Sequence, residues 1–177
     1  RTASEYRREY PDQETPYLML AGMMEMAGNK DGAKKVLRDG LEHVVGSIAL
    51  PYQLAVRLHR AGDTATAIKM YEMVLRLDPT HVASLNNSAD IQANDGDLQV
   101  AKMLASRAFA LAPESKSVAD TLGWIYFLSG ELNIAHKHLL GAFNGKANRT
   151  ITCHLALTEA ALSLTSAKDR LGECLVM

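Results

Sequence analysis

The sequence predicts an all-α protein, built as a solenoid of antiparallel helix pairs. Two ladders of small residues support this prediction. Glycines recur at one fixed interval, and an alanine follows each of them at the fifth position: Gly28, Gly62, Gly96 and Gly130, then Ala33, Ala67, Ala101 and Ala135. Apolar residues between them recur at helical spacing, not in the alternation typical of strands. A fixed period of about 34 residues indicates stacked helix-turn-helix repeats, which usually serve recognition and not chemistry.

Four repeats follow one another without insertion or deletion, at residues 14–47, 48–81, 82–115 and 116–149. The glycine at position 15 of each repeat is expected to end the first helix in a left-handed conformation. Asp63, Asp97 and Glu131 come directly after it and place negative charge where the second helix begins. Pro79 and Pro113 are expected to end second helices, because proline lacks a backbone donor.

Residues 1–13 are predicted to be the end of a preceding repeat. Pro11 lies one period before Val45 and two periods before Pro79, so it stands at the position of a repeat-ending proline. The chain is therefore expected to belong to a longer array.

Residues 150–177 are predicted to form a degenerate fifth helix pair that caps the array. Leu155 and Ala156 resemble the Leu-Ala pair of the earlier repeats, displaced one residue toward the N-terminus. Gly141 and Gly145 are expected to shorten the second helix of the fourth repeat. A terminal pair would cover the last apolar face of the solenoid.

Composition excludes several classes of function. The 177 residues have a formal net charge of -1 and no basic block, so we expect no nucleic-acid partner. No apolar run reaches the ~20 residues of a membrane helix, and no direct membrane insertion by this segment is expected. Cys153 and Cys174 could be buried free thiols or a pair, and they do not settle the redox compartment.

Catalytic residues, metal ligands and cofactors are not predicted. His136 and His138 stand two apart on a helix and point in different directions, unlike paired ligands four apart. Cys153 and His154 are adjacent, but no local motif supports a thiol nucleophile. The chain has no glycine-rich phosphate loop and no serine elbow.

The period and the recurring small, turn and apolar positions resemble the tetratricopeptide-repeat (TPR) family over residues 14–149. The family's tryptophan at position 4 is replaced in every repeat. The resemblance implies a right-handed superhelix whose first helices line a concave groove, with positions 2, 5, 6, 9, 12 and 13 facing it. The groove residues singled out on this basis are Tyr52, Gln53, Val56, Asn86, Asn87, Asp90, Asn94, Asp120, Thr121, Trp124 and Phe127.

This groove would suit an extended peptide. Amide side chains both donate and accept, so Gln53, Asn86 and Asn87 could hold a ligand backbone, and Tyr52 and Trp124 offer large anchors. The predicted function is a non-catalytic scaffold that binds a protein or peptide segment. A merely solvated face remains the alternative for the polar residues. The basic residues of the carboxylate-clamp TPR domains, which grip chaperone C-termini, are absent from the matching positions.

Two alternatives remain open for the aromatic pair Trp124 and Phe127. They could anchor a ligand, or they could pack under the terminal helix pair. The second functional hypothesis is a structural spacer or self-association module, in which these rings and the terminal pair bury against another copy.

Four segments resemble one particular group of TPR proteins. Leu85–Ala89, Ala108–Pro113, Ala119–Ile125 and His154–Leu157 are similar to the C-terminal repeats of bacterial envelope and exopolysaccharide TPR proteins, of the PEP-CTERM/exosortase-associated lipoprotein type. That resemblance implies a periplasmic scaffold for export or polysaccharide assembly. Composition does not distinguish it from a cytoplasmic location.

Overall fold

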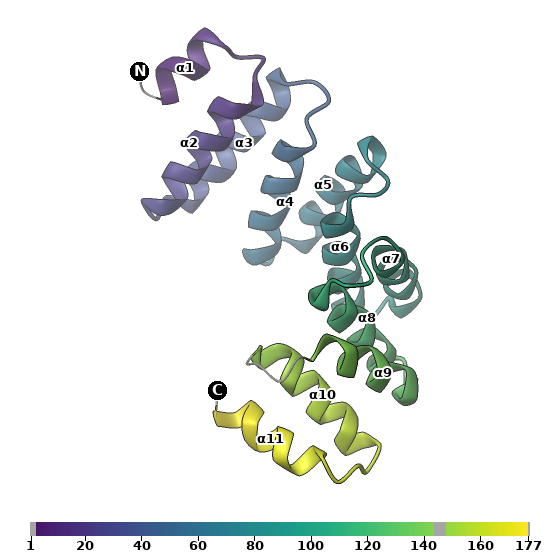
Figure 1. Ribbon diagram of the computed structural model, residues 1–177. Helices are drawn as coiled ribbons and strands as arrows, with labels where there is room; N and C mark the ends of the chain where they lie inside the picture. The colour runs from purple at the N-terminus through teal and green to yellow at the C-terminus, as the bar shows by residue number, and fades with distance from the viewer. Residues whose placement is uncertain (1–2, 144–147, 177) are drawn as a thin grey trace. The chain divides into compact units, whose positions relative to one another are not determined.

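The computed structural model describes residues 3–143 and 148–176, and the regular elements within those ranges are all α-helices (Figure 1). They are α1 (Ala3–Glu9), α2 (Glu14–Met26), α3 (Lys30–His43), α4 (Ala49–Arg60), α5 (Thr64–Leu77), α6 (Val82–Asn94), α7 (Leu98–Leu111), α8 (Lys116–Leu128), α9 (Leu132–Ala142), α10 (Arg149–Ala161) and α11 (Ala167–Val176). The predicted all-α class is confirmed. Among the described helices, none has the length and apolar character needed to cross a bilayer.

Consecutive helices pack as pairs. Contacts join α2 to α3, α4 to α5, α8 to α9 and α10 to α11. Buried alanines of α6 and α7 share one core cluster, which also contains Leu122 and Ile125 of α8. The alanine ladder lies at the centre of this packing, since Ala33, Ala67, Ala101 and Ala135 are all 0% exposed.

Small residues are required where the two helices of a pair approach each other. A Cβ atom added to Gly123 of α8 would lie 2.7 Å from Cγ of Leu139 and 3.2 Å from the backbone oxygen of Ala135, both on α9. Those distances are shorter than van der Waals contact, so position 8 of this repeat tolerates no side chain without a shift of α9.

The turn inside each pair has the predicted left-handed glycine. The φ angles of Gly28, Gly62, Gly96 and Gly130 are 78°, 82°, 89° and 77°. The Oδ1 atoms of Asp63 and Asp97 then accept from backbone N–H groups three residues on, both at 3.2 Å, and cap α5 and α7. Glu131 makes no such capping bond to α9 and instead forms an ion pair with Lys102.

The last pair departs from the period by one residue. The first helix α8 begins at Lys116, whereas α10 begins at Arg149, one residue short of the full period. Leu155 and Ala156 are 0% exposed, in agreement with the displaced Leu-Ala pair. The preceding helix α9 has 11 residues where α5 and α7 have 14. Gly145, which was expected to shorten α9, lies outside the described residues.

The chain divides into two compact units, which we call the N-terminal unit, up to Ser84, and the C-terminal unit, from Leu85 onward. Each has a core of its own. Leu50, Leu54 and Tyr71 are 0–1% exposed in the N-terminal unit, and Ile125 and Leu139 are 0% exposed in the C-terminal unit.

Candidate functional site

The first helices of the C-terminal unit surround a cavity of about 320 Å³. Side chains of α6, α8 and α10 line it, and α8 and α10 are in direct contact. The lining residues are Asn86, Asn87, Asp90, Ser117, Asp120, Thr121, Trp124, Asn148, Thr150, Ile151 and His154. We refer to this space below as the groove cavity.

Six of the eleven residues singled out in the sequence line the groove cavity: Asn86, Asn87, Asp90, Asp120, Thr121 and Trp124. They occupy positions 5, 6 and 9 of the third and fourth repeats, which recur on one face of a helix. Asn94 is exposed at the end of α6 and does not line the cavity. Phe127 packs against a buried cluster of Ala135, Leu139 and Leu155.

The other three residues belong to the N-terminal unit, and they do not line the groove cavity. The ring of Tyr52 lies 4.9 Å from that of His81 and 6.2 Å from that of Tyr71. Gln53 accepts a 2.7 Å hydrogen bond from Arg57 Nη1 through its side-chain oxygen. Val56 is half-buried. Tyr52 and Gln53 therefore make defined contacts within their own unit.

Trp124 packs under the terminal helix pair, which is one of the two alternatives left open by the sequence; its role as a ligand anchor stays a prediction. Its ring stacks on that of His154 at 4.1 Å and on that of Phe127 at 4.8 Å, so it packs beneath α10. It also lines the groove cavity. These contacts hold the indole in one orientation, as a rigid wall of the cavity.

An acid and a histidine join α8 to α10 at the cavity. The Nδ1–H of His154 donates to Asp120 Oδ1 at 2.9 Å, and Asp120 is 8% exposed. A buried carboxylate is costly without such a partner. His154 was not among the groove residues predicted from the sequence; in the displaced register of α10 it is the equivalent of Thr121, which itself lines the cavity.

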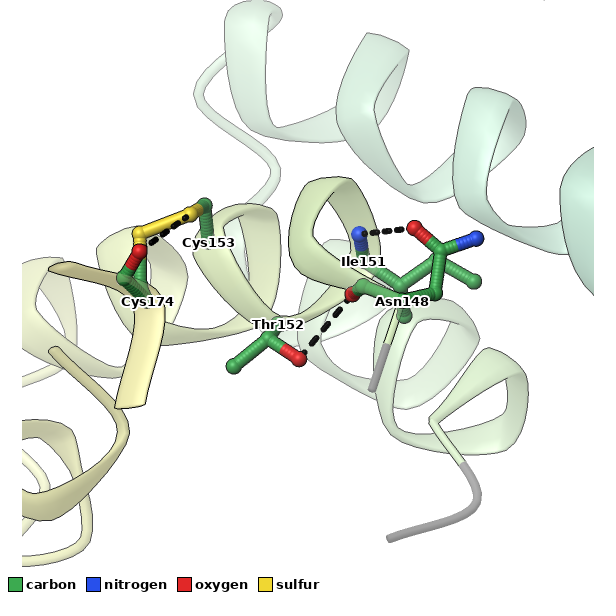
Figure 2. Close-up of a disulfide and its surroundings, with 5 residues drawn as sticks. All are labelled: Asn148, Ile151, Thr152, Cys153 and Cys174. Atoms are coloured by element: carbon green, nitrogen blue, oxygen red, sulfur yellow. Dashed lines mark hydrogen bonds between the residues drawn. A yellow bond between two sulfur atoms is a disulfide. The ribbon is translucent and has the colours of Figure 1, made fainter. Parts of the chain in front are cut away.

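The start of α10 contributes Asn148, Thr150 and Ile151 to the cavity lining, and Figure 2 shows two hydrogen bonds there. Asn148 Oδ1 accepts from the backbone N–H of Ile151 at 3.4 Å, and the Thr152 hydroxyl donates to the Asn148 carbonyl at 3.0 Å. The first is an N-cap bond, which satisfies a donor that the helix end leaves free, and the second joins the Thr152 side chain to the backbone carbonyl four residues earlier. They fix Asn148, Thr150 and Ile151 beside the residues of α8 in the cavity lining.

Cys153 and Cys174 form a disulfide between α10 and α11, with 5.1 Å between their Cα atoms (Figure 2). Of the two alternatives that the sequence left open, free thiols or a pair, the structure shows the pair. Disulfides persist mainly in oxidising compartments. Cys153 precedes His154 directly, so the disulfide lies next to a residue of the groove cavity.

A buried ion pair also holds α11 in place. Arg170 Nε of α11 donates to both carboxylate oxygens of Glu159, at 3.0 and 2.9 Å, and Glu159 is 2% exposed. The Arg170 guanidinium lies 4.6 Å from the centre of the Phe143 ring. His136 Nε2 approaches Glu159 Oε1 at 3.5 Å.

The two histidines considered as metal ligands have separate surroundings. His136 is beside Glu159, while the ring of His138 stacks on Tyr126 at 5.6 Å and meets Phe109 edge-on at 4.9 Å. Burial lowers the pKa of His138 below its ordinary value, and the charge of nearby Lys137 lowers it further. Within residues 3–143 and 148–176, no group of three or more metal-ligating side chains is assembled.

Known proteins resemble the chain in sequence and in fold. No model of a protein family matches it. It is 25% identical over 154 residues to the TPR repeat-containing protein PA4667 of Pseudomonas aeruginosa, a match that covers 84% of this chain. The chain spans about a quarter of that relative's length, 26%.

Among solved structures, the fragment "MamA 41-end" from Desulfovibrio magneticus RS-1 superposes with a TM-score of 0.79 and 17% identity, covering 90% of this chain and 91% of that one. YrrB, described as a TPR protein with an unusual peptide-binding site, superposes with a TM-score of 0.78 and 14% identity, covering 99% and 91%. At these identities the likeness shows the fold.

Proposed function

We propose, from the premise that this chain is a tetratricopeptide-repeat protein, that it is a non-catalytic scaffold whose groove cavity binds an extended peptide segment of a partner. The observation that supports this most directly is the composition of the cavity. Side chains at the same repeat positions on α6 and α8 converge on one hollow, together with the start of α10.

The chemistry of the lining fits a peptide. Asn86 and Asn87 each have a carboxamide that can donate to a carbonyl and accept from an N–H, the two groups that every peptide bond presents. The wall formed by Trp124 offers apolar area in a fixed orientation, and so binding would order few side chains. The relative YrrB is itself described as having a peptide-binding site.

A pair of substitutions tests this proposal. Pools of fluorescently labelled random octapeptides are titrated with the intact chain, and anisotropy is measured. Asn87→Ala combined with Thr121→Ala removes two polar contacts from the cavity, and we expect affinity to fall about tenfold or more. Helicity by circular dichroism should be unchanged, because both side chains are partly exposed.

The matched control removes two polar side chains elsewhere. The control variant combines Gln99→Ala with Asn133→Ala. Both residues are exposed, and they lie on the second helices α7 and α9. This control should bind the pools like the unaltered chain. Equal affinity of the cavity variant and the control would reject the groove assignment.

The second candidate function is a spacer or self-association module of an envelope assembly, and the disulfide supports its location. A Cys153–Cys174 bond would be stable in a periplasm and unusual in a reducing cytoplasm. Exposed apolar side chains on α7 and α9, such as Met103 and Ile134 at 54% and 42%, offer surface for a second copy. Sedimentation velocity over a hundredfold range of protein concentration tests self-association. A chain that stays monomeric over the whole range would contradict this second function.

A further inference from the structure

We propose that the groove cavity selects a cationic side chain, lysine or arginine, in the peptide that it binds. This inference rests on the proposed peptide-binding function and adds the chemical class of the residue that enters the cavity. It follows from the charges and the hydrogen-bonding groups of the lining and from the shape of its apolar wall.

The ionisable groups of the lining are mostly acidic. Asp90 and Asp120 bring two carboxylates, whereas none of the eleven lining residues is lysine or arginine. His154 is the remaining titratable side chain, and its Nδ1–H is already directed at Asp120. A concave site with one sign of charge focuses its field on the space inside it, and this favours a ligand of the opposite sign.

Two polar groups of the lining favour a ligand that donates hydrogen bonds. The Thr121 hydroxyl donates to the Ser117 carbonyl at 3.0 Å, so its hydrogen is used within α8. Asn86 Oδ1 is a buried acceptor without a hydrogen-bond partner. A ligand that donates a hydrogen bond would satisfy such an acceptor. Ammonium and guanidinium groups are donors only, and a carboxylate is an acceptor only.

The wall of the cavity fits the stem of such a side chain. Trp124 stacks on His154 and on Phe127, and the part of its indole that these rings leave uncovered lines the cavity together with Asp120. Lysine and arginine carry aliphatic stems that pack along apolar surface while their charged ends reach polar groups. A volume of about 320 Å³ is near the lower limit of ligand pockets, so it suits one long side chain with its adjoining backbone.

The acidic character is local to this cavity. A second hollow, of about 270 Å³ in the N-terminal unit, is lined by four basic residues and two acidic ones: Lys30, Lys34, Arg57, Arg60, Glu25 and Asp31. The formal net charge of the chain is only -1. A preference for cationic peptides would therefore come from the groove cavity and not from the overall charge.

Peptide pools with one fixed central residue test the inference on the unaltered chain. Labelled octapeptides carry arginine, lysine, citrulline or glutamate at the centre and random neutral residues elsewhere, and anisotropy gives their affinities. We expect the arginine and lysine pools to bind about tenfold more tightly than the citrulline and glutamate pools. Citrulline has nearly the shape of arginine without its charge, so the difference isolates the charge.

A charge-removing variant locates the effect. Asp120→Asn keeps an acceptor for His154 and the shape of the side chain, and it should reduce the preference for arginine over citrulline to less than about threefold. Asp95→Asn makes the same charge change at an exposed residue outside the cavity lining. It should keep the full preference.

The outcomes separate this inference from the proposed function. Equal binding of all four pools, or tighter binding of the glutamate pool, would reject the selectivity while leaving peptide binding intact. Absence of binding by every pool would reject both. Loss of the preference in Asp95→Asn as well as in Asp120→Asn would also contradict the inference, because the effect would then lie outside the groove cavity.

Discussion

Ser163 has a left-handed backbone conformation, with φ of 56°, which costs a residue with a side chain about 1–2 kcal/mol. Ser163 lies 33 residues after Gly130, one fewer than the full period. In the displaced fifth pair, this is the position of the turn between the two helices. The hydrogen bonds match as well. The N–H of Leu164 donates to the Glu159 carbonyl at 2.9 Å, as that of Glu131 donates to the Tyr126 carbonyl at 2.9 Å. The same turn thus forms with serine where the other four have glycine.

Replacing Ser163 by glycine is therefore expected to stabilise the chain. Glycine removes the left-handed strain but adds freedom to the unfolded state, so the net gain should be about 0.5–1 kcal/mol. Urea denaturation measures it. The control Ser129→Gly changes the same residue type at φ of -82°, where glycine relieves no strain, and should destabilise. A Ser163→Gly chain that unfolds more easily would contradict the strain argument.

The lowered pKa of His138 makes stability depend on pH. Because the folded value lies below the ordinary 6.5, the unfolded chain binds the proton more readily. The stabilising contribution of neutral His138 is thus complete above pH 6.5 and is lost as the pH falls toward the folded pKa.

His138→Phe should remove this part of the pH dependence while keeping an aromatic ring against Tyr126 and Phe109. The free energy of unfolding, measured at pH 8 and pH 5, should fall less in the variant than in the unaltered chain. His43→Phe at an exposed position provides the control and should keep the original difference. An equal fall in all three proteins would exclude His138 as its source.

At the scale of elements, α11 is attached to α10 by two different bonds. The disulfide Cys153–Cys174 joins them covalently, and the Glu159–Arg170 ion pair joins them in the buried interface. The disulfide closes a segment with a sequence separation of 21 residues. Closing a loop of this length removes entropy from the unfolded chain and stabilises the fold by about 3 kcal/mol.

Cys153→Ser with Cys174→Ser is expected to lose roughly 3 kcal/mol of unfolding free energy. Hydrogen exchange followed by mass spectrometry compares the variant with the unaltered chain. The variant should show a larger increase in exchange rate in α11 than in α8 and α9. The ion pair should keep α11 partly protected. The unaltered chain treated with a reductant should match the variant, and unchanged exchange in α11 under both conditions would show that the disulfide does not anchor it.

At the scale of the whole molecule, the two compact units have separate cores. Repeat proteins obtain their stability from each repeat and its contacts with the nearest repeats. A substitution in one repeat is therefore expected to destabilise that repeat and its neighbours more than distant repeats. Leu54 in the N-terminal unit and Leu139 in the C-terminal unit are equally buried, at 1% and 0% exposure. They provide a matched pair of core truncations.

Leu54→Ala should cost about 2–5 kcal/mol, because it leaves a cavity in the core. We expect hydrogen exchange to accelerate mainly in α2 to α5. Leu139→Ala should have the reverse pattern, with faster exchange in α8 to α10. Uniform acceleration over all helices in both variants would show one cooperative unit and contradict the separate cores.

Local chemistry made much of the fold predictable from the sequence. The turn glycines, the caps at Asp63 and Asp97, and the buried alanines each depend on a few neighbouring residues, which recur with the repeat. The same register identified all of the residues of α6 and α8 that line the groove cavity except Ser117. The protein-binding function assigned to them stays a proposal.

Tertiary structure decided what depends on distances between helices. The one-residue displacement of α10 brings His154 onto Trp124 and Asp120. The packing of α11 on α10 joins Cys153 to Cys174 and Glu159 to Arg170. A repeat sequence encodes its turns and small contacts locally, and it therefore determined the helix pairs by itself. The partners of these cysteines, acids and histidines are remote in the chain, so only the packed helices could determine them.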